Sequence, residues 1–599
     1  MQSTRVGGGA CRPHKPAWLL VASALLGSSG CILSDFEIDY GYSTGGAAGQ
    51  GGTAGMGSAG MSGGGSGGSA GGTSRISPPR LAADRYIMLQ GTSLDRDASV
   101  GLLANDSPVN LRVNGFSNLE PSRPRSFDAD LMVAPDGSFH FVPPPRFFGS
   151  YRFTYTVENL VGQTASESVE IRVLPTQIDL DAIIQGIGGF VLYGASGEGL
   201  GTVLDRAFDV NADGRADILL GAPGANAGDG AAFVVFGKDD LDSVDVEPRA
   251  PGTRERRYAS VTGGSGEGLG ASVAGLGDLD GDGAADIAIG ASSGAGRAYF
   301  VFATELNPAN SVPFSRGFSI EGDPANVAVA NVLRGGGDVD ADGVPDVLLS
   351  AVNGDFGWLH VPFGDGTLQG ELGLTEAPGA HVRGAQASDG FVRDAAFVGD
   401  LDGDGTDEVL AASDGAFYLF RGGAALPSDA SATSVSGSRA GYRVARVVPG
   451  AASVSGIGDI NADGSPDLAY CDPARCAVVQ GPISTLGQAT LVGGFRRKTR
   501  HVLVRGGGDV DGDGLADMLF ADDQRAYLVY GDRAGVQPLD VSALGSRGFS
   551  VSAAAGGSVT AIAILGDVNR DGLADIAISD ASADDNAGRV YVVFGIASR

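Results

Sequence analysis

The chain has 599 residues and carries 71 Asp and Glu against 41 Lys and Arg, a formal net charge of −30 at pH 7. With this excess of negative charge, nucleic acid is not an expected partner. With only four cysteines, disulfides cannot form the framework of the fold.

Residues 1–30 have the pattern of a signal peptide for export. A basic start is followed by the apolar run Ala17–Leu26, which is too short to span a bilayer. The next residues, Gly27-Ser-Ser-Gly-Cys31, resemble the bacterial lipobox, except that Ser28 stands where that motif usually has Leu. The resemblance implies a lipid on Cys31 and an outer-membrane or cell-surface lipoprotein, attached to the membrane through the lipid only. The alternative is secretion with an unmodified Cys31.

Residues 31–75 are predicted to be a disordered, Gly-rich tether. Between Ser43 and Ser74 nearly every residue is Gly, Ala, Ser, Thr or Met. Such a segment cannot bury enough apolar surface to fold, and it behaves as a flexible linker.

Residues 76–175 are predicted to form a small β-sandwich. Tyr151–Val157 and Ser168–Val173 alternate apolar and polar residues, as half-buried strands do. Pro135-Asp-Gly137 supplies a turn before the strand-like run Ser138–Phe141. Together with Leu102–Asp106, these pieces resemble the cadherin-like, immunoglobulin-like repeats of bacterial surface adhesins. The resemblance implies a spacer domain.

The remaining residues, 176–599, repeat one acidic motif seven times. The motif is Asp-x-Asp/Asn-x-Asp-Gly-x-x-Asp/Glu, and successive copies start 50 to 69 residues apart. We number these acidic loops one to seven: Asp209–Asp217, Asp278–Asp286, Asp338–Asp346, Asp400–Glu408, Asp459–Asp467, Asp509–Asp517 and Asp567–Asp575. A period in this range indicates a repeat architecture in which no unit buries its apolar face alone.

The acidic loops are predicted to bind up to seven Ca²⁺ ions. Side chains at positions 1, 3, 5 and 9 and the backbone carbonyl at position 7 would supply hard oxygen ligands around a tight turn. Gly at position 6 permits that turn because it tolerates positive φ. The predicted ligands are Asp209, Asn211, Asp213, Arg215 and Asp217; Asp278, Asp280, Asp282, Ala284 and Asp286; Asp338, Asp340, Asp342, Val344 and Asp346; Asp400, Asp402, Asp404, Thr406 and Glu408; Asp459, Asn461, Asp463, Ser465 and Asp467; Asp509, Asp511, Asp513, Leu515 and Asp517; and Asp567, Asn569, Asp571, Leu573 and Asp575. A solvated acidic turn is the alternative for any one copy.

Charge should differ between the loops. Asn211, Asn461 and Asn569 at position 3 remove one carboxylate each from loops one, five and seven, which should weaken those sites. Loop four ends in Glu408 with Asp407 beside it, so its geometry is shifted. Positions 1, 3, 5 and 9 hold 25 carboxylates in total. Binding of seven Ca²⁺ would change the formal net charge from −30 to −16 (−30 + 14).

An EF-hand is excluded by the residue at position 12. An EF-hand needs a bidentate Glu there and a helix on each side. This chain instead has Leu220, Ile289, Leu349, Ala411, Tyr470, Phe520 or Ile578 at that position, within apolar runs that are typical of buried strands.

The units resemble FG-GAP repeats, the modules of the integrin α-chain β-propeller. Unit one has both pieces that give the repeat its name, Gly221-Ala-Pro223 after the loop and Phe236-Gly237 at the end of the next strand. Related endings are Phe300–Phe302, Pro362–Gly364, Leu419–Phe420, Val529–Gly531 and Val593–Gly595. The resemblance implies an all-β fold, a seven-bladed β-propeller with four strands per blade, and calcium. We expect Gly189–Gly194 to complete the last blade beside residues 558–595, and helices to be nearly absent.

The sequence offers little for catalysis, so no enzyme is expected. His140, His360, His381 and His501 are far apart, and no nucleophile elbow, P-loop or zinc motif is present. The Gly-rich pieces Ser196–Gly201 and Ser265–Gly270 recur at the repeat spacing, which favours turns over phosphate binding.

Cys471 and Cys476 flank a predicted hairpin turn and could form a disulfide, two free thiols being the alternative.

The function predicted from the family resemblance is recognition or adhesion at a cell surface, with a protein or glycan ligand. A glycan-binding lectin is the first alternative, and shallow aromatic-lined pockets repeated between blades would favour it. A secreted hydrolase is the second, and one deep polar cleft with perturbed acids would favour that.

Overall fold

The fold is seen in a computed structural model, which describes residues 77–598 with gaps. The gaps are 122–128, 187, 239–243, 246–257, 307–309, 312–316, 323–326, 354–355, 365–367, 375, 385–389, 415, 424–425, 427–429, 432–440, 447–452, 473–475, 483–489, 494–501 and 555. The predicted signal peptide, the predicted tether, Cys31 and His501 lie outside the described residues.

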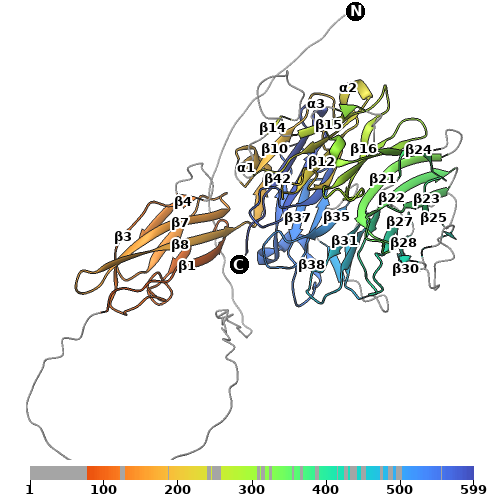
Figure 1. The fold of residues 1–599 in the computed structure, drawn as a ribbon. Coiled ribbons are helices and arrows are strands. Elements are labelled where there is room, and N and C mark those ends of the chain that lie inside the picture. Colours follow the sequence, from red (N-terminus) through yellow and green to blue (C-terminus); the bar gives the residue numbers. More distant parts are fainter. Residues whose placement is uncertain are drawn as a thin grey trace, which may run out of the picture. The chain divides into compact units, whose positions relative to one another are not determined.

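Two β-sheets occupy residues 84–174. One contains β1 (Asp84–Leu89), β8 (Thr164–Leu174), β7 (Gly149–Glu158) and β3 (Arg112–Phe116), with β4 (Glu120–Pro121) also paired to β7; the other contains β2 (Leu94–Arg96), β6 (Phe139–Val142) and β5 (Asp130–Val133). Figure 1 shows the long strands β7 and β8 lying along β1. Both predicted strands are confirmed, since they lie within β7 and β8.

The two sheets share one apolar core. Alternate residues of β7 are buried, and Tyr151 and Tyr155 are fully enclosed together with Phe141 of the second sheet. The predicted turn at Pro135–Gly137 joins β5 to β6, with Gly137 at φ +86°. The period-two pattern therefore identified the buried face of this domain correctly.

Among the described residues from 177 onward, the strands form seven further sheets (Figure 1). From the first strand outward, the first three are β11 (Val203–Phe208), β12 (Asp217–Ala222), β13 (Ala231–Val235), β15 (Tyr258–Thr262) and β19 (Asn310–Ser311); β16 (Leu269–Gly277), β17 (Asp286–Ala291), β18 (Arg297–Val301), β20 (Phe318–Glu321) and β24 (Gly370–Gly373); and β21 (Val327–Gly337), β22 (Asp346–Asn353), β23 (Phe356–Pro362), β25 (Gly379–Arg383) and β29 (Ala430–Ser431). The fourth is β26 (Ala395–Phe397), β27 (Val409–Ala412), β28 (Ala416–Phe420) and β30 (Gly441–Arg446). The last three are β31 (Ser453–Gly458), β32 (Asp467–Cys471), β33 (Cys476–Val479), β34 (Thr490–Gly493) and β38 (Leu539–Asp540); β35 (Leu503–Gly508), β36 (Asp517–Asp522), β37 (Arg525–Val529), β39 (Gly548–Ser552) and β9 (Gln177–Asp179); and β40 (Ala561–Gly566), β41 (Asp575–Asp580), β42 (Arg589–Val593), β10 (Gly189–Tyr193) and β14 (Val244–Asp245).

The all-β prediction is confirmed for the described residues. Their helical elements are short: α1 (Leu180–Ile184), α2 (Ala225–Gly228), α3 (Ala583–Asn586) and the 3₁₀ turns η1 (Ala303–Glu305), η3 (Val541–Ala543) and η4 (Gly545–Arg547). Within this part of the chain, no helix has the length and apolar character needed to cross a membrane.

The seven sheets are connected in a cyclic order. The first strand of each sheet contacts the first strand of the next, from β11 through β16, β21, β26, β31 and β35 to β40, and β40 contacts β11. As predicted, the segment that begins at Gly189 joins the last sheet, where β10 pairs antiparallel with β42. Strands from the two ends of this region therefore share one sheet.

The second strand of each sheet pairs with a strand on both sides and is largely buried. In β12, β17, β36 and β41 all six residues are buried, including the acidic residue that begins each strand. The apolar side chains pack between neighbouring sheets, as in the cluster of Phe190 and Ala577 from the last sheet with Phe233 from the first. Because each sheet covers the face of its neighbour, no sheet buries its apolar residues alone.

Candidate metal centre

Each acidic loop connects the first strand of a sheet to its second strand. The glycines at position 6 all have φ between +82° and +93°, which confirms the predicted turn. Position 4 also has positive φ in every loop: Ala212, Gly281, Ala341, Gly403, Ala462, Gly512 and Arg570. The sequence did not predict positive φ at this second position because four of the loops have Ala or Arg there, which adopt positive φ far less readily than Gly.

Hydrogen bonds to backbone N–H groups hold the carboxylates of each loop in place. In loop two, Asp278 Oδ1 accepts from Gly281 and Asp282, at 2.7 and 3.0 Å, and its Oδ2 accepts from Gly283 at 2.9 Å. Asp282 in turn accepts from the N–H of Ala284 at 2.9 Å. The turn is thus wound around its own acidic side chains, which fixes where their oxygens point.

In four loops the acidic oxygens converge. Three carboxylates in each have oxygens within 4.8 Å of one another: Asp278, Asp280 and Asp282; Asp338, Asp340 and Asp346; Asp400, Asp402 and Asp404; and Asp509, Asp511 and Asp517. These clusters could hold a metal ion, and a set of carboxylate oxygens suits a hard divalent cation. The clusters of loops three and six include position 9, whereas those of loops two and four include position 5.

Loops one, five and seven, which have Asn at position 3, are arranged differently. The side-chain amides of Asn211, Asn461 and Asn569 donate to the carboxylate at position 5, over 3.2, 3.0 and 3.0 Å. An amide donor thus occupies an oxygen that is predicted to be a ligand. The oxygens of these amides accept the backbone N–H at position 5, as Asp280 does in loop two. The weaker binding expected of these three loops stays a prediction.

The acidic residue at position 9 joins the loop to the end of the third strand. In loop seven, Asp575 Oδ2 accepts the N–H of Val568 at 3.0 Å, and Oδ1 accepts the N–H of Gly595 at 2.8 Å. The same pair of bonds occurs at Asp217, to Val210 and Gly237. The glycine of the Phe-Gly ending is therefore a backbone donor to the acidic loop, a role that the sequence did not reveal.

Burial makes these position-9 carboxylates costly to ionise. It raises the pKa of Asp217, Asp286, Asp346 and Glu408 to about 7, that of Asp467 to about 6 and that of Asp517 to about 8. Burial also raises the pKa of Asp575 well above its usual range. A nearby cation would favour the charged form and offset this cost.

Loop four keeps the usual bond at position 9 but carries an ion pair at position 3. Glu408 Oε2 accepts the N–H of Leu401 at 2.7 Å, so the longer side chain reproduces the usual position-9 bond. Asp402 forms an ion pair with Arg421 at 2.9 Å. A cation in this loop would therefore compete with a guanidinium for the carboxylate at position 3.

Neighbouring acidic loops are joined directly through their backbones. The N–H at position 8 donates to the carbonyl at position 1 of the preceding loop in five places: Ala216 to Asp567, Ala285 to Asp209, Asp407 to Asp338, Ala516 to Asp459 and Ala574 to Asp509, over 2.8–3.1 Å. Loops three and five have Pro345 and Pro466 at position 8. Proline has no N–H, so these two loops cannot make the bond.

The three histidines among the described residues occupy structural positions. His360 of β23 stacks on His381 of β25 with ring centroids 4.0 Å apart. Burial, with a further contribution from His381, lowers the pKa of His360 to about 3. His140 of β6 contacts Asp95 on the neighbouring strand, over 2.5 Å. None of these three adjoins an acidic loop in the sequence.

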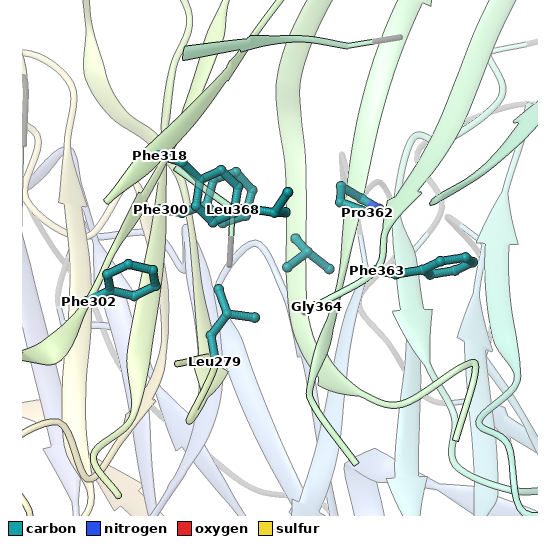
Figure 2. Close-up of a pocket in the computed structure, with 9 residues that line it drawn as sticks. Leu279, Phe300, Phe302, Phe318, Pro362, Phe363, Gly364 and Leu368 are labelled. Carbon is teal, nitrogen blue, oxygen red and sulfur yellow. The ribbon is translucent and has the colours of Figure 1, made fainter. Parts of the chain in front are cut away.

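A small cavity lies between the sheets of β16 and β21 (Figure 2). Its volume is about 10 Å³, and its lining includes Phe300, Phe302 and Phe363, from the Phe-Gly-like endings of two units. Figure 2 shows Phe300 and Phe318 overlapping, and their rings stack at 4.2 Å. The space is that of about one water molecule. These endings therefore act in packing, and the cavity offers no side chain for catalysis.

The Gly-rich pieces form turns. Gly197, Gly199 and Gly201 have positive φ, as do Gly266, Gly268 and Gly270. Within each turn the Glu carboxylate accepts a backbone N–H, from Ala195 to Glu198 at 3.0 Å and from Gly264 to Glu267 at 2.6 Å. A carboxylate at the centre of the turn disfavours a phosphate there, as the sequence indicated.

In the fifth sheet a disulfide joins Cys471 to Cys476.

Two segments of the chain match known sequence families. Residues 77–172 match the bacterial Ig domain, and residues 200–235, which contain loop one, match the FG-GAP repeat. The chain is also similar to integrin alpha-5 of Xenopus laevis, with 30% identity over 190 residues. That similarity covers 29% of this chain and spans 17% of the integrin. The FG-GAP, integrin-like and Ig-like resemblances are confirmed; the lipobox resemblance stays a prediction.

Proposed function

We propose that residues 176–599 form a closed seven-bladed β-propeller whose acidic loops bind calcium. Support for closure comes from the cyclic contacts of the first strands and from the pairing of β10 with β42. Closure leaves no long sheet edge open to another chain, which is the physical advantage of a ring over a linear stack.

Each acidic loop takes one Ca²⁺ through the oxygens at positions 1, 3, 5, 7 and 9. The four convergent carboxylate clusters carry this part of the proposal. The position-9 oxygens already accept N–H groups, but each carboxylate oxygen has a second lone pair for a cation. The metal is structural here: it offsets the repulsion among the acidic side chains and so fixes the turn between two strands.

The propeller acts as a recognition or adhesion module at a cell surface. The similarity to integrin alpha-5 supports this function. In this proposal residues 1–30 direct export, a lipid on Cys31 anchors the chain, residues 31–75 form the tether and residues 76–175 form the spacer. Substituting Cys31→Ser should abolish labelling with radioactive palmitate, whereas the control Cys11→Ser should retain it.

Binding arrays test the recognition function. The full chain, probed on protein and glycan arrays with calcium and again with EGTA, should bind a set of proteins only when calcium is present. Binding confined to saccharides would replace the proposal with a lectin. Binding to proteins that is equally strong in EGTA would contradict the structural role of the metal.

A further inference from the structure

A second cavity lies where the first strands of all seven sheets meet. Its volume is about 300 Å³, and its lining includes residues of β11, β16, β21, β26, β31, β35 and β40. This volume is at the lower end of the range for small-molecule sites. The cavity is separate from the apolar space in Figure 2.

Strand register explains why the cavity is open. In each sheet, one residue of the first strand pairs with the residue that lies two positions after the end of the acidic loop. These seven first-strand residues are structurally equivalent. They are Asp205, Ala274, Arg334, Ala396, Ser455, Arg505 and Ala563. Four of the seven are Ala or Ser, too short to fill the space. The two long side chains, Arg334 and Arg505, thus belong to one layer.

The two arginines share a single buried carboxylate. Asp394 Oδ1 accepts from Arg334 at 2.6 Å, and its Oδ2 lies 3.4 Å from Arg505. Ser453 also donates to Asp394, over 3.1 Å. Burial opposes ionisation of Asp394, yet Arg334 and Arg505 hold its pKa below the usual range. One carboxylate therefore serves two cations.

Both guanidinium groups keep donors for a further partner. Each side chain is 25% exposed, and each lines the cavity. Among the described residues, Nε of Arg334 and Nε and Nη2 of Arg505 have no hydrogen-bond partner. Burial, followed by the charge of Arg334, lowers the pKa of Arg505. An anion between the two groups would relieve that repulsion.

We propose that this cavity binds a small molecule through an oxyanion, a carboxylate or a phosphate-type group, held between Arg334 and Arg505. The planar guanidinium fork matches two oxygens of such a group. Asp205 and Asp407 also line the cavity, and their charges limit the site to a small anion rather than a polyanion. The proposal does not depend on calcium binding by the acidic loops.

Calorimetric titration tests the site with two probes, succinate and sulfate, on the full chain at a fixed free calcium concentration. We expect saturable binding with a Kd of about 1 mM or below for at least one probe. Binding of succinate alone assigns a carboxylate, of sulfate alone a phosphate-type group, and of both an oxyanion from either source. No saturable binding of either probe up to about 10 mM overturns the proposal.

Variants locate the binding. Arg334→Gln and Arg505→Gln should each weaken it at least about tenfold, which is the loss of about 1.4 kcal/mol. The control Arg297→Gln removes an arginine that pairs with Glu321 and Glu371 away from the cavity, and should bind within about twofold of the original chain. Unchanged binding in both cavity variants overturns the proposal.

A chemical-protection experiment uses the original chain. It therefore avoids the variants, in which Asp394 keeps only one of its two cationic partners. Phenylglyoxal modifies exposed arginines, and mass spectrometry of peptides reads each site separately. At about ten times Kd, the probe that binds should slow modification of Arg334 and Arg505 about tenfold and leave Arg297 unaffected. Equal rates with and without that probe contradict the proposal.

Discussion

Removal of calcium should lower the melting temperature of the seven-sheet region by about 13 °C. Four acidic loops bring three carboxylates together. At a calcium concentration of a hundred times their Kd, each of these four sites stabilises the fold by about 2.7 kcal/mol, or about 11 kcal/mol together; the three loops with Asn at position 3, which are expected to bind more weakly, are left out of this sum. A region of roughly 400 residues unfolds with an entropy of about 0.8 kcal/mol per degree, which converts that energy to about 13 °C.

Differential scanning calorimetry in calcium, in EGTA and after restoring calcium measures this shift. The double substitution Asp278→Asn with Asp280→Asn should remove one site, so the shift between calcium and EGTA should shrink by about 3 °C. The exposed Asp585→Asn, in α3, is the matched control and should keep the full shift. A midpoint that moves less than about 2 °C on chelation would refute the reasoning, as would an undiminished shift in the double variant.

Three further predictions concern other parts of the chain. Burial raises the pKa of Asp84 to about 7, so the folded β-sandwich binds a proton that the unfolded chain releases, and stability falls as pH rises from about 4 to about 7. Asp84→Asn should remove this dependence and stabilise the chain by up to about 4 kcal/mol at pH 8. Chemical denaturation at pH 8 measures the change, and a less stable variant would contradict the prediction. A Cβ at Gly189 would lie 1.8 Å from the carbonyl oxygen of Val592, so Gly189→Val should cost about 3 kcal/mol or more by melting, whereas Gly493→Ala, with no atom within 4 Å, should change stability by less than about 0.5 kcal/mol. Replacing Cys471 and Cys476 together by Ser should cost about 2 kcal/mol in urea, since the closed loop is short; a larger loss would mean that the bond supports more than its own hairpin.

Local patterns in the sequence were sufficient for the elements that depend on near neighbours. The glycines at position 6, the strands β7 and β8 and the turn at Pro135–Gly137 each depend on residues a few positions apart, so their chemistry is visible in the sequence. The place of Gly189 in the last sheet followed from the repeat order. That inference needed only the count of strands before the first acidic loop.

Contacts across long separations were not predictable. The bond from Gly595 to Asp575 spans 20 residues, and Arg505 meets Asp394 across 111. Each depends on strand register and on the packing of one sheet against the next, which single residues do not encode. The acidic residue at position 9 was interpreted as a metal ligand alone, since nothing in the motif indicates that its two oxygens also accept backbone N–H groups.

Pro345 and Pro466 divide the circle of acidic loops into two arcs. Loops five, six, seven, one and two are linked peptide to peptide, and loops three and four form a separate pair. A shift in one turn can pass along its own arc through the linked peptide groups but meets a break at each proline. Calcium should therefore bind cooperatively within an arc and independently between arcs, and replacing both prolines by Ala would offer the two missing donors and merge the arcs into one.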